Sequence, residues 1–250
     1  CLLLLILAFR PNTSAGQTAR PEVSVVLNIF IGFDPREAIA YHVCANSLTR
    51  LSSDVLAITP LSLHNLKTYN ETHTDGSNHF IYTRFLIPSL MNYNGWALFM
   101  DCDMLVLDDM ADLWKLRDDN FAVQVVKHHH VPEETTKFLG NPQSKYEKKN
   151  WPSVMLFNNT KCRALTPQYV NTATGLELYR FQWLGDDDLI GDIPHRWNHL
   201  VGYDETVPAG EVSNLHYTIG GPYFDDYKDT DYAPEWFAEK DAMLRCDQKK

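Results

Sequence analysis

The chain has 250 residues, 44% of them hydrophobic, and a formal net charge of −10. This length suits one large domain or two small ones with a substantial core. Lys and Arg form no long cluster, which argues against a nucleic-acid partner, because binding a phosphate backbone needs a basic surface. An acidic protein that binds a diphosphate would need a metal ion to neutralise the charge.

The five cysteines indicate neither a disulfide framework nor a zinc site. They are odd in number, lack a Cys-x-x-Cys pair and are scattered along the chain at Cys1, Cys44, Cys102, Cys162 and Cys246. We expect Cys44 and Cys102 to be buried thiols, which behave as small hydrophobic side chains.

Residues 1–9 are wholly apolar, yet the run is shorter than the roughly 20 residues that span a bilayer. The run begins with Cys rather than Met, and a stretch rich in Pro, Ser and Thr follows it. We therefore expect a truncated signal or membrane-anchor remnant plus linker at 1–21, and a folded domain at 22–250. An ordinary buried strand is the alternative for the apolar run. An anchor or signal would place the protein in a Golgi-type or secretory compartment; otherwise a cytoplasmic enzyme is expected.

The folded part opens with a predicted strand, a tight turn and a helix. Val23–Phe33 is rich in β-branched and aromatic residues, and Glu37–Leu51 has apolar residues at helical spacing. This order is typical of a doubly wound α/β sheet, whose ligands bind at the carboxyl ends of the strands. Asp34 stands at such an end, where it either contacts a nucleoside or caps the helix.

An arginine lies within the next predicted helix, Phe80–Met91, which follows a second predicted strand at Val55–Leu63. The planar guanidinium of Arg84 suits a phosphate or a carboxylate ligand. A structural salt bridge to a nearby Asp is the alternative.

The stretch Trp96–Met100 is continuously apolar, as expected of a strand covered on both faces, and it ends at Asp101 and Asp103. In an extended chain, residues i and i+2 point to the same side, so the two carboxylates can aim at one point. Two carboxylates so close repel each other unless a cation lies between them, and hard oxygen ligands suit Mg²⁺ or Mn²⁺. The alternative is that both are turn and helix-cap residues.

Histidines occur at two places in the second half. The strand predicted at Phe121–Val126 runs into three adjacent histidines, residues 128–130. Neighbours in an extended chain alternate sides, so the run cannot converge on one metal; no zinc site is expected there, although one member is expected to line the pocket. His216 lies in a last short strand within Val212–Gly221, where a neutral imidazole either binds Mn²⁺ or is a satisfied core residue.

The remaining elements complete an alternating pattern. They are a strand at Trp151–Asn158, a helical stretch at 162–184, an acidic group at Asp186–Asp188 and a C-terminal helix around Trp236.

The order of these pieces resembles the glycosyltransferase family 8 group, which includes glycogenin and bacterial galactosyltransferases. The resemblance runs from about residue 24 to 225 and rests on the ordered set Tyr82-x-Arg84-Phe85, Leu-Phe-Met-Asp-Cys-Asp (98–103), Val-Met-Leu-Phe-Asn (154–158), Asp186-Asp-x-Leu-Ile, Pro194-x-x-Trp-Asn and His216. It implies a GT-A fold with a single doubly wound mixed sheet flanked by helices. It also implies a nucleotide-sugar donor, usually UDP-linked, a Mn²⁺ requirement and retention of anomeric configuration.

The resemblance assigns roles to particular residues. Asp101, Asp103 and His216 match the metal ligands, Arg84 an arginine that contacts the donor, and Asp34 the nucleoside-contacting strand end. Asp186 and Asp187 match the acid–amide pair near the reacting sugar, although many members have Gln at the second position.

Two departures affect the donor pocket. Family members often carry His-x-x-Gly-x-x-Lys-Pro, whose Lys holds the diphosphate, whereas this chain reads His216-Tyr-Thr-Ile-Gly-Gly-Pro222. We expect the backbone N–H groups of Gly220 and Gly221 to take over part of that role. In place of the family's Asn-Ala-Gly stands Trp151-Pro-Ser, so the sugar pocket is expected to differ.

The sequence thus predicts a metal-dependent hexosyltransferase that uses a nucleotide-sugar donor, with a carbohydrate, lipid or protein acceptor. A non-catalytic sugar-nucleotide-binding relative is the alternative, motivated by the missing Lys. A phosphatase that uses Asp-x-Asp is disfavoured, because Met104-Leu105 follow where such enzymes have Gly and Thr.

Overall fold

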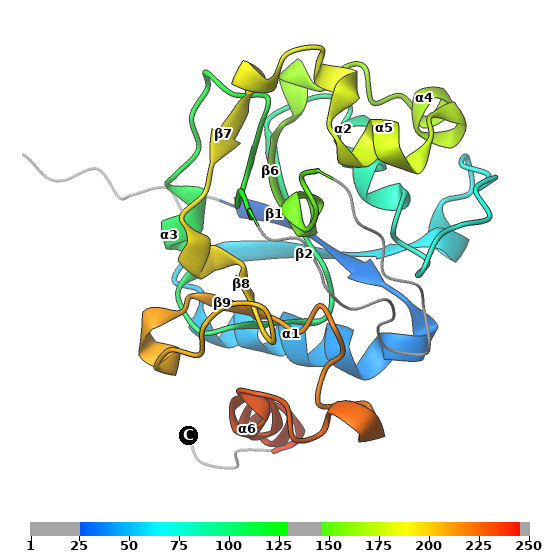
Figure 1. The fold of residues 1–250 in the computed structure, drawn as a ribbon. Helices are drawn as coiled ribbons and strands as arrows, with labels where there is room; N and C mark the ends of the chain where they lie inside the picture. Colours follow the sequence, from blue (N-terminus) through cyan, green and yellow to red (C-terminus); the bar gives the residue numbers. More distant parts are fainter. Residues whose placement is uncertain (1–25, 130–146, 246–250) are drawn as a thin grey trace, which may run out of the picture.

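A computed structural model describes residues 26–129 and 147–245, which form a mixed sheet flanked by helices (Figure 1). The predicted remnant and linker at 1–21 lie outside this part of the chain and stay a prediction. Within the described ranges, no helix combines the length and the apolar composition that crossing a membrane requires.

The central sheet has six strands in the order β2-β1-β3-β6-β5-β7. β1 is parallel to β2 and to β3, β6 is antiparallel to β3 and to β5, and β7 is parallel to β5. The strands are β1 (Val26–Phe33), β2 (Val55–Ser62), β3 (Trp96–Met100), β5 (Val123–Val125), β6 (Val154–Asn158) and β7 (Ile190–Asp192). β6 is buried throughout and β3 nearly so, which accounts for their continuous apolar composition. The predicted α/β fold is confirmed.

A second, three-stranded sheet lies beside the first, and the sequence did not predict it. It consists of β4 (Met104–Val106), β9 (Asn214–His216) and β8 (His199–Leu200). β9 is the middle strand, antiparallel to β4 and parallel to β8. This sheet continues directly from Asp101 and Asp103, so it decides what surrounds them.

The long helix α1 (Ala38–Leu51) packs on β1 and β4 and is itself covered by α6 (Ala233–Leu244) (Figure 1). Trp236, 1% exposed, anchors α6, and Glu239 binds Arg50 of α1 at 2.6 Å. The other helices are α2 (Ile87–Leu90), α3 (Met110–Trp114), α4 (Pro167–Thr172) and α5 (Gly175–Tyr179). The predicted C-terminal helix is confirmed, and so are the buried thiols Cys44 and Cys102.

Two helical predictions were too long. The stretch 162–184 divides into α4, α5 and a 3-10 turn, because the Thr166 and Thr174 side chains cap two separate helices. Thr174 forms a capping box with Glu177, which starts a new helix where a continuous one was predicted. The stretch 80–91 is likewise a 3-10 turn over Thr83–Leu86 followed by the short α2.

Candidate active site

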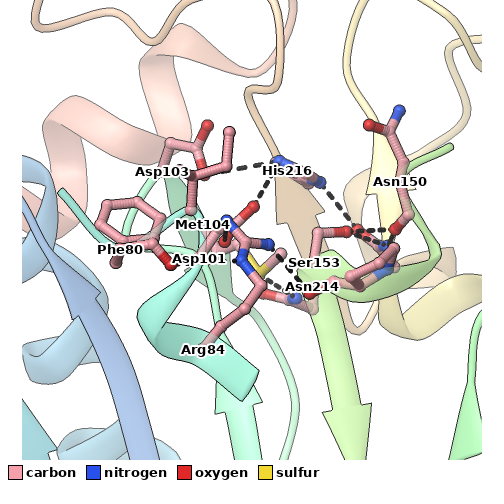
Figure 2. A network of polar contacts seen from close by, with 12 residues as sticks. Phe80, Arg84, Asp101, Asp103, Met104, Asn150, Ser153, Asn214 and His216 are labelled. Carbon is pink, nitrogen blue, oxygen red and sulfur yellow. Dashed lines mark hydrogen bonds and ion pairs between the residues drawn. The ribbon is translucent and has the colours of Figure 1, made fainter. Parts of the chain in front are cut away.

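Asp101, Asp103 and His216 converge at the carboxyl end of β3. The Nε2 atom of His216 lies 3.4 Å from Oδ1 of Asp103 and 3.8 Å from Oδ2 of Asp101. Figure 2 shows the two carboxylates and the imidazole turned toward one another. One ligand atom from each residue lies within 4.8 Å of the others. The predicted geometry, with both carboxylates aimed at one point and the late histidine beside them, is therefore present.

The small sheet brings His216 to the carboxylates. In the antiparallel pairing of β4 with β9, Met104 stands opposite His216. The backbone N–H of Tyr217 donates to the carbonyl oxygen of Asp103 at 2.9 Å, which extends this pairing to the second aspartate. Because the register is held by main-chain hydrogen bonds, the backbone of His216 is fixed beside the two carboxylates.

The orientation of His216 is set by Asn198, a fully buried residue. Its amide N–H₂ donates to Oγ of Ser153 at 2.8 Å, so its Oδ1 is the atom that faces Nδ1 of His216 at 2.9 Å. A carbonyl oxygen accepts only, which assigns the proton of the imidazole to Nδ1. In the neutral imidazole the lone pair is therefore on Nε2, the atom that faces the two carboxylates.

This donor set fits a divalent cation. Two carboxylate oxygens and an imidazole lone pair directed at one point repel one another unless positive charge lies between them. Oxygen-rich ligand sets with one imidazole suit Mn²⁺ or Mg²⁺. The hydrogen bond from Nδ1 of His216 to Asn198 is of the kind that usually orients a metal-binding histidine.

Arg84 lies beside this group and pairs with protein groups, while its predicted contact with the donor stays a prediction. Its guanidinium contacts Oδ1 of Asp101 at 3.0 Å, and NH1 donates to the carbonyl oxygen of Pro152 at 2.9 Å. It is 4% exposed and stacks over the Phe99 ring at 4.8 Å. The salt bridge that the sequence left as an alternative is thus present, and Arg84 holds the orientation of Asp101 (Figure 2).

A cleft of about 600 Å³ opens over the three converging residues. Its further charged lining consists of Arg84, Glu37 and Lys149. Glu37, 1% exposed, accepts a hydrogen bond from the Tyr223 hydroxyl at 2.9 Å, and Lys149 is 8% exposed. Asn78, Asn150, Ser153, Tyr179 and Thr218 supply polar groups around them.

Asp34 caps the turn after β1 and does not line the cleft. Its carboxylate binds the guanidinium of Arg36 at 2.6 Å and accepts from the backbone N–H groups of Arg36 and His79 at 2.9 and 3.1 Å. Arg36 also donates to the carbonyl oxygen of Ser77, a lining residue. The structure thus has the capping alternative, through which Asp34 holds one wall of the cleft in place.

We expect Asp34→Ala to destabilise the fold by about 2 kcal/mol at pH 7, since it removes a cap and the charge-assisted hydrogen bonds from Arg36 and His79. Burial opposes ionisation, yet hydrogen bonds from Arg36 and His79 hold the pKa of Asp34 below its ordinary value of 3.8. A folded-state pKa below the unfolded one stabilises the protein above the unfolded pKa, and this contribution is lost as the pH falls through the folded pKa. Urea unfolding of both proteins from pH 7 to 3 measures the difference, which should shrink below about pH 4. A difference of equal size at pH 3 would contradict a charge-based role.

Asp186 and Asp187 lie in a different hollow, lined also by Lys148, Arg180 and Gly185. Asp186 caps a 3-10 turn by accepting from the Asp188 N–H at 2.9 Å, and Asp187 binds Nζ of Lys148 at 2.5 Å. The structure does not bring these two residues to the three converging ones, so their assignment to the reacting sugar remains a prediction. Lys149 and Asn150, which follow Lys148 in the sequence, line the cleft over Asp101, Asp103 and His216.

Gly220 and Gly221 are buried and do not line the cleft. A Cβ at Gly220 would lie 2.6 Å from the Tyr227 ring, and one at Gly221 would meet the Tyr223 ring. The close approach of the tyrosine rings therefore explains why both positions are glycine. Their predicted contact with a diphosphate stays a prediction.

Sequence reasoning missed Glu37, Lys149 and Asn198. An acid in a first helical turn normally reads as a complement to the helix dipole, and a lysine in a polar stretch as a solvated one. Asn198 was within a recognised segment, but nothing in the sequence connects it to His216. For all three, the signal exists only in the folded chain.

Comparisons with known proteins agree with this geometry. The sequence model of the family described as Glycosyl transferase family 8 matches residues 29–172. Protein CDI of Arabidopsis thaliana is 42% identical over 231 residues, which cover 89% of each chain.

Solved structures resemble the chain at low identity. The bifunctional glycosyltransferase WbbM has a TM-score of 0.60 and 16% identity, and the match covers 89% of this chain and 50% of WbbM. GlyE of Streptococcus pneumoniae TIGR4 gives 0.57 and 15%, covering 86% of this chain and 60% of GlyE. The galactosyltransferase LgtC, solved with donor and acceptor sugar analogs, gives 0.56 and 14%, covering 89% and 98%. These likenesses show the GT-A fold, while the family model and the Arabidopsis relative show that this chain belongs to glycosyl transferase family 8 and is a glycosyltransferase.

Proposed function

We propose that this glycosyltransferase moves a sugar from a UDP-linked donor to an acceptor hydroxyl, with retention of configuration and with Mn²⁺ or Mg²⁺ bound. The observation that carries the proposal is the convergence of Asp101, Asp103 and His216 under a cleft that also holds Lys149. Retention and the uridine nucleotide are inferred from the family.

The charges of the cleft support a metal requirement. Its lining has three carboxylates, Glu37, Asp101 and Asp103, and two cationic side chains, Arg84 and Lys149. The resulting net negative charge of the lining would repel a diphosphate. A bound divalent ion would make the net charge of the site positive.

Each residue then has a defined task. Asp101, Asp103 and His216 would hold the ion, which when bound stabilises the negative charge on the departing nucleoside diphosphate. Arg84 fixes the carboxylate of Asp101, and Asn198 keeps the lone pair of His216 directed at the ion site. Lys149 adds a buried cation to the lining of the cleft and would take the place of the lysine missing after His216.

The proposal is tested by incubating the purified chain with a panel of nucleotide sugars and Mn²⁺ and following release of nucleoside diphosphate. We expect one UDP-sugar to be hydrolysed, or transferred when acceptor sugars are added, with activity lost in EDTA and restored by Mn²⁺. The anomeric configuration of the product, read by NMR, tests retention. Donor binding without turnover on any sugar would instead support the non-catalytic alternative.

We expect Asn198→Ala to weaken Mn²⁺ binding by about 10- to 100-fold, the usual loss when the partner of a metal-binding histidine is removed. Mn²⁺ affinity is measured by electron paramagnetic resonance, alongside thermal unfolding. Asn214→Ala is the matched control, because Asn214 is similarly buried and lies two residues from His216, but its side-chain amide donates to Met104 and to the carbonyl oxygen of Trp197. Equal losses of Mn²⁺ affinity in both variants would contradict an orienting role for Asn198 and would indicate that it only contributes to packing.

A further inference from the structure

A second cluster of ligand atoms is linked to the active site by Asn198, which contacts both His216 and His128. His128, which follows β5, meets His195 and Asp204, which lie before and after β8. One ligand atom from each lies within 4.8 Å of the others. His128 is about 70 positions away from the segment that holds His195 and Asp204, so the meeting of the three residues is a product of the fold.

The carboxylate is the centre of this cluster. Oδ2 of Asp204 lies 3.2 Å from Nε2 of His195 and 3.8 Å from Nδ1 of His199, and the backbone N–H of Leu200 donates to it at 2.6 Å. The rings of His128 and His195 stand edge to face, with centroids 5.2 Å apart. Burial opposes ionisation of Asp204, but hydrogen bonds from His195 and Leu200 hold its pKa below the ordinary carboxyl value. The group therefore presents a carboxylate surrounded by imidazoles.

We propose that His128, His195 and Asp204 form a zinc-binding site separate from the donor site. Two imidazoles and one carboxylate, with the fourth position left to water or to His199, are a ligand set that zinc accepts in tetrahedral geometry. The donor site has the reverse ratio of carboxylates to imidazoles, which suits harder ions. The two sites thus differ in the metal they select.

The geometry is close to what zinc needs. Ligand atoms bonded to tetrahedral zinc at about 2.0–2.2 Å lie roughly 3.4 Å from one another. The pair His195 and Asp204 already meets this spacing, with zinc taking the place of the proton between them. His128, 7% exposed, contacts the Asn198 amide nitrogen through Nε2 at 3.0 Å. Because that nitrogen donates, the lone pair of His128 accepts this hydrogen bond, and zinc would have to displace Asn198 from it.

Access and charge favour a cation. His195 and Asp204 line an open hollow of about 650 Å³, together with the carboxylates of Glu205 and Glu211. Arg196, the one cationic side chain among the lining residues, binds Asp108 at 3.0 Å. A divalent ion therefore enters a mostly negative hollow.

Zinc binding to the tag-free full chain, stripped of metal with a chelator, tests the proposal by calorimetry. The Asp101→Asn, Asp103→Asn double variant removes the donor-site carboxylates, and we expect it to retain one zinc equivalent. His195→Gln and Asp204→Asn, each made in that background, should weaken zinc binding by at least about 100-fold, since loss of an outer-shell partner alone costs about 10- to 100-fold. Circular dichroism verifies that every variant is folded.

His129→Gln is the matched control, because His129 is adjacent to His128 but exposed and outside the cluster. We expect it to bind zinc as its parent does. X-ray absorption of the zinc-loaded double variant should show two histidine ligands. The proposal is overturned if the double variant binds no zinc, or if the His195→Gln and Asp204→Asn proteins, shown to be folded, bind zinc as tightly as their parent.

Discussion

Asp103→Asn is expected to lower metal-dependent sugar transfer by at least about 1,000-fold, because charge stabilisation by the bound ion is worth several kcal/mol and each 1.4 kcal/mol is a tenfold change in rate. Asn is nearly isosteric with Asp, so the backbone bond from Tyr217 to residue 103 is kept. The metal-free variant should melt at or above the wild-type temperature, since the change removes repulsion between two carboxylates. Donor turnover at saturating Mn²⁺ and thermal unfolding in EDTA measure the two effects.

Asp112→Asn serves as the control for this experiment. Asp112 is an exposed aspartate on α3 whose pairing with Lys115 is a surface contact worth little. It should leave turnover unchanged. Full transfer activity in the Asp103→Asn protein would refute the metal assignment and the proposed mechanism with it.

Lys149→Met is expected to reduce kcat/KM for the nucleotide-sugar donor by roughly 10- to 150-fold, which corresponds to the 1.5–3 kcal/mol of a hydrogen bond to a charged group. Met keeps most of the apolar stem of the side chain and removes only the ammonium. The loss should extend to the affinity for free UDP, because the proposed contact is to the diphosphate. Initial-rate kinetics and UDP titration distinguish a diphosphate contact from one made in the transition state alone.

Lys148→Met is the matched control, since it changes the same residue type one position earlier. Lys148 binds Asp187 and the carbonyl oxygen of Arg180 in the neighbouring hollow. If Lys149 supplies the diphosphate cation, UDP affinity falls only in the Lys149 variant. If it falls only in the Lys148 variant, the donor diphosphate binds at the hollow of Asp186 and Asp187 instead.

Local backbone geometry accounts for what could be predicted along the chain. The apolar run Trp96–Met100 had to be a buried strand, and the alternation of side chains in extended backbone placed Asp101 and Asp103 on one side of it. The same short-range rules predicted the first strand and helix. They failed at 162–184, where two Thr caps interrupt an apolar pattern that would otherwise suit one helix.

By itself, the sequence determined the α/β class, the carboxylate pair and, through family resemblance, His216 as its partner. Only the tertiary structure decided that Asn198 orients that histidine, that Arg84 pairs with Asp101, and that Glu37 and Lys149 line the cleft while Asp34 does not. It also placed Asp186 and Asp187 in a separate hollow and His128 beside His195 and Asp204. The physical reason is range: a strand is specified by a few neighbouring residues, whereas a site joins segments whose approach depends on how the whole chain pairs and packs.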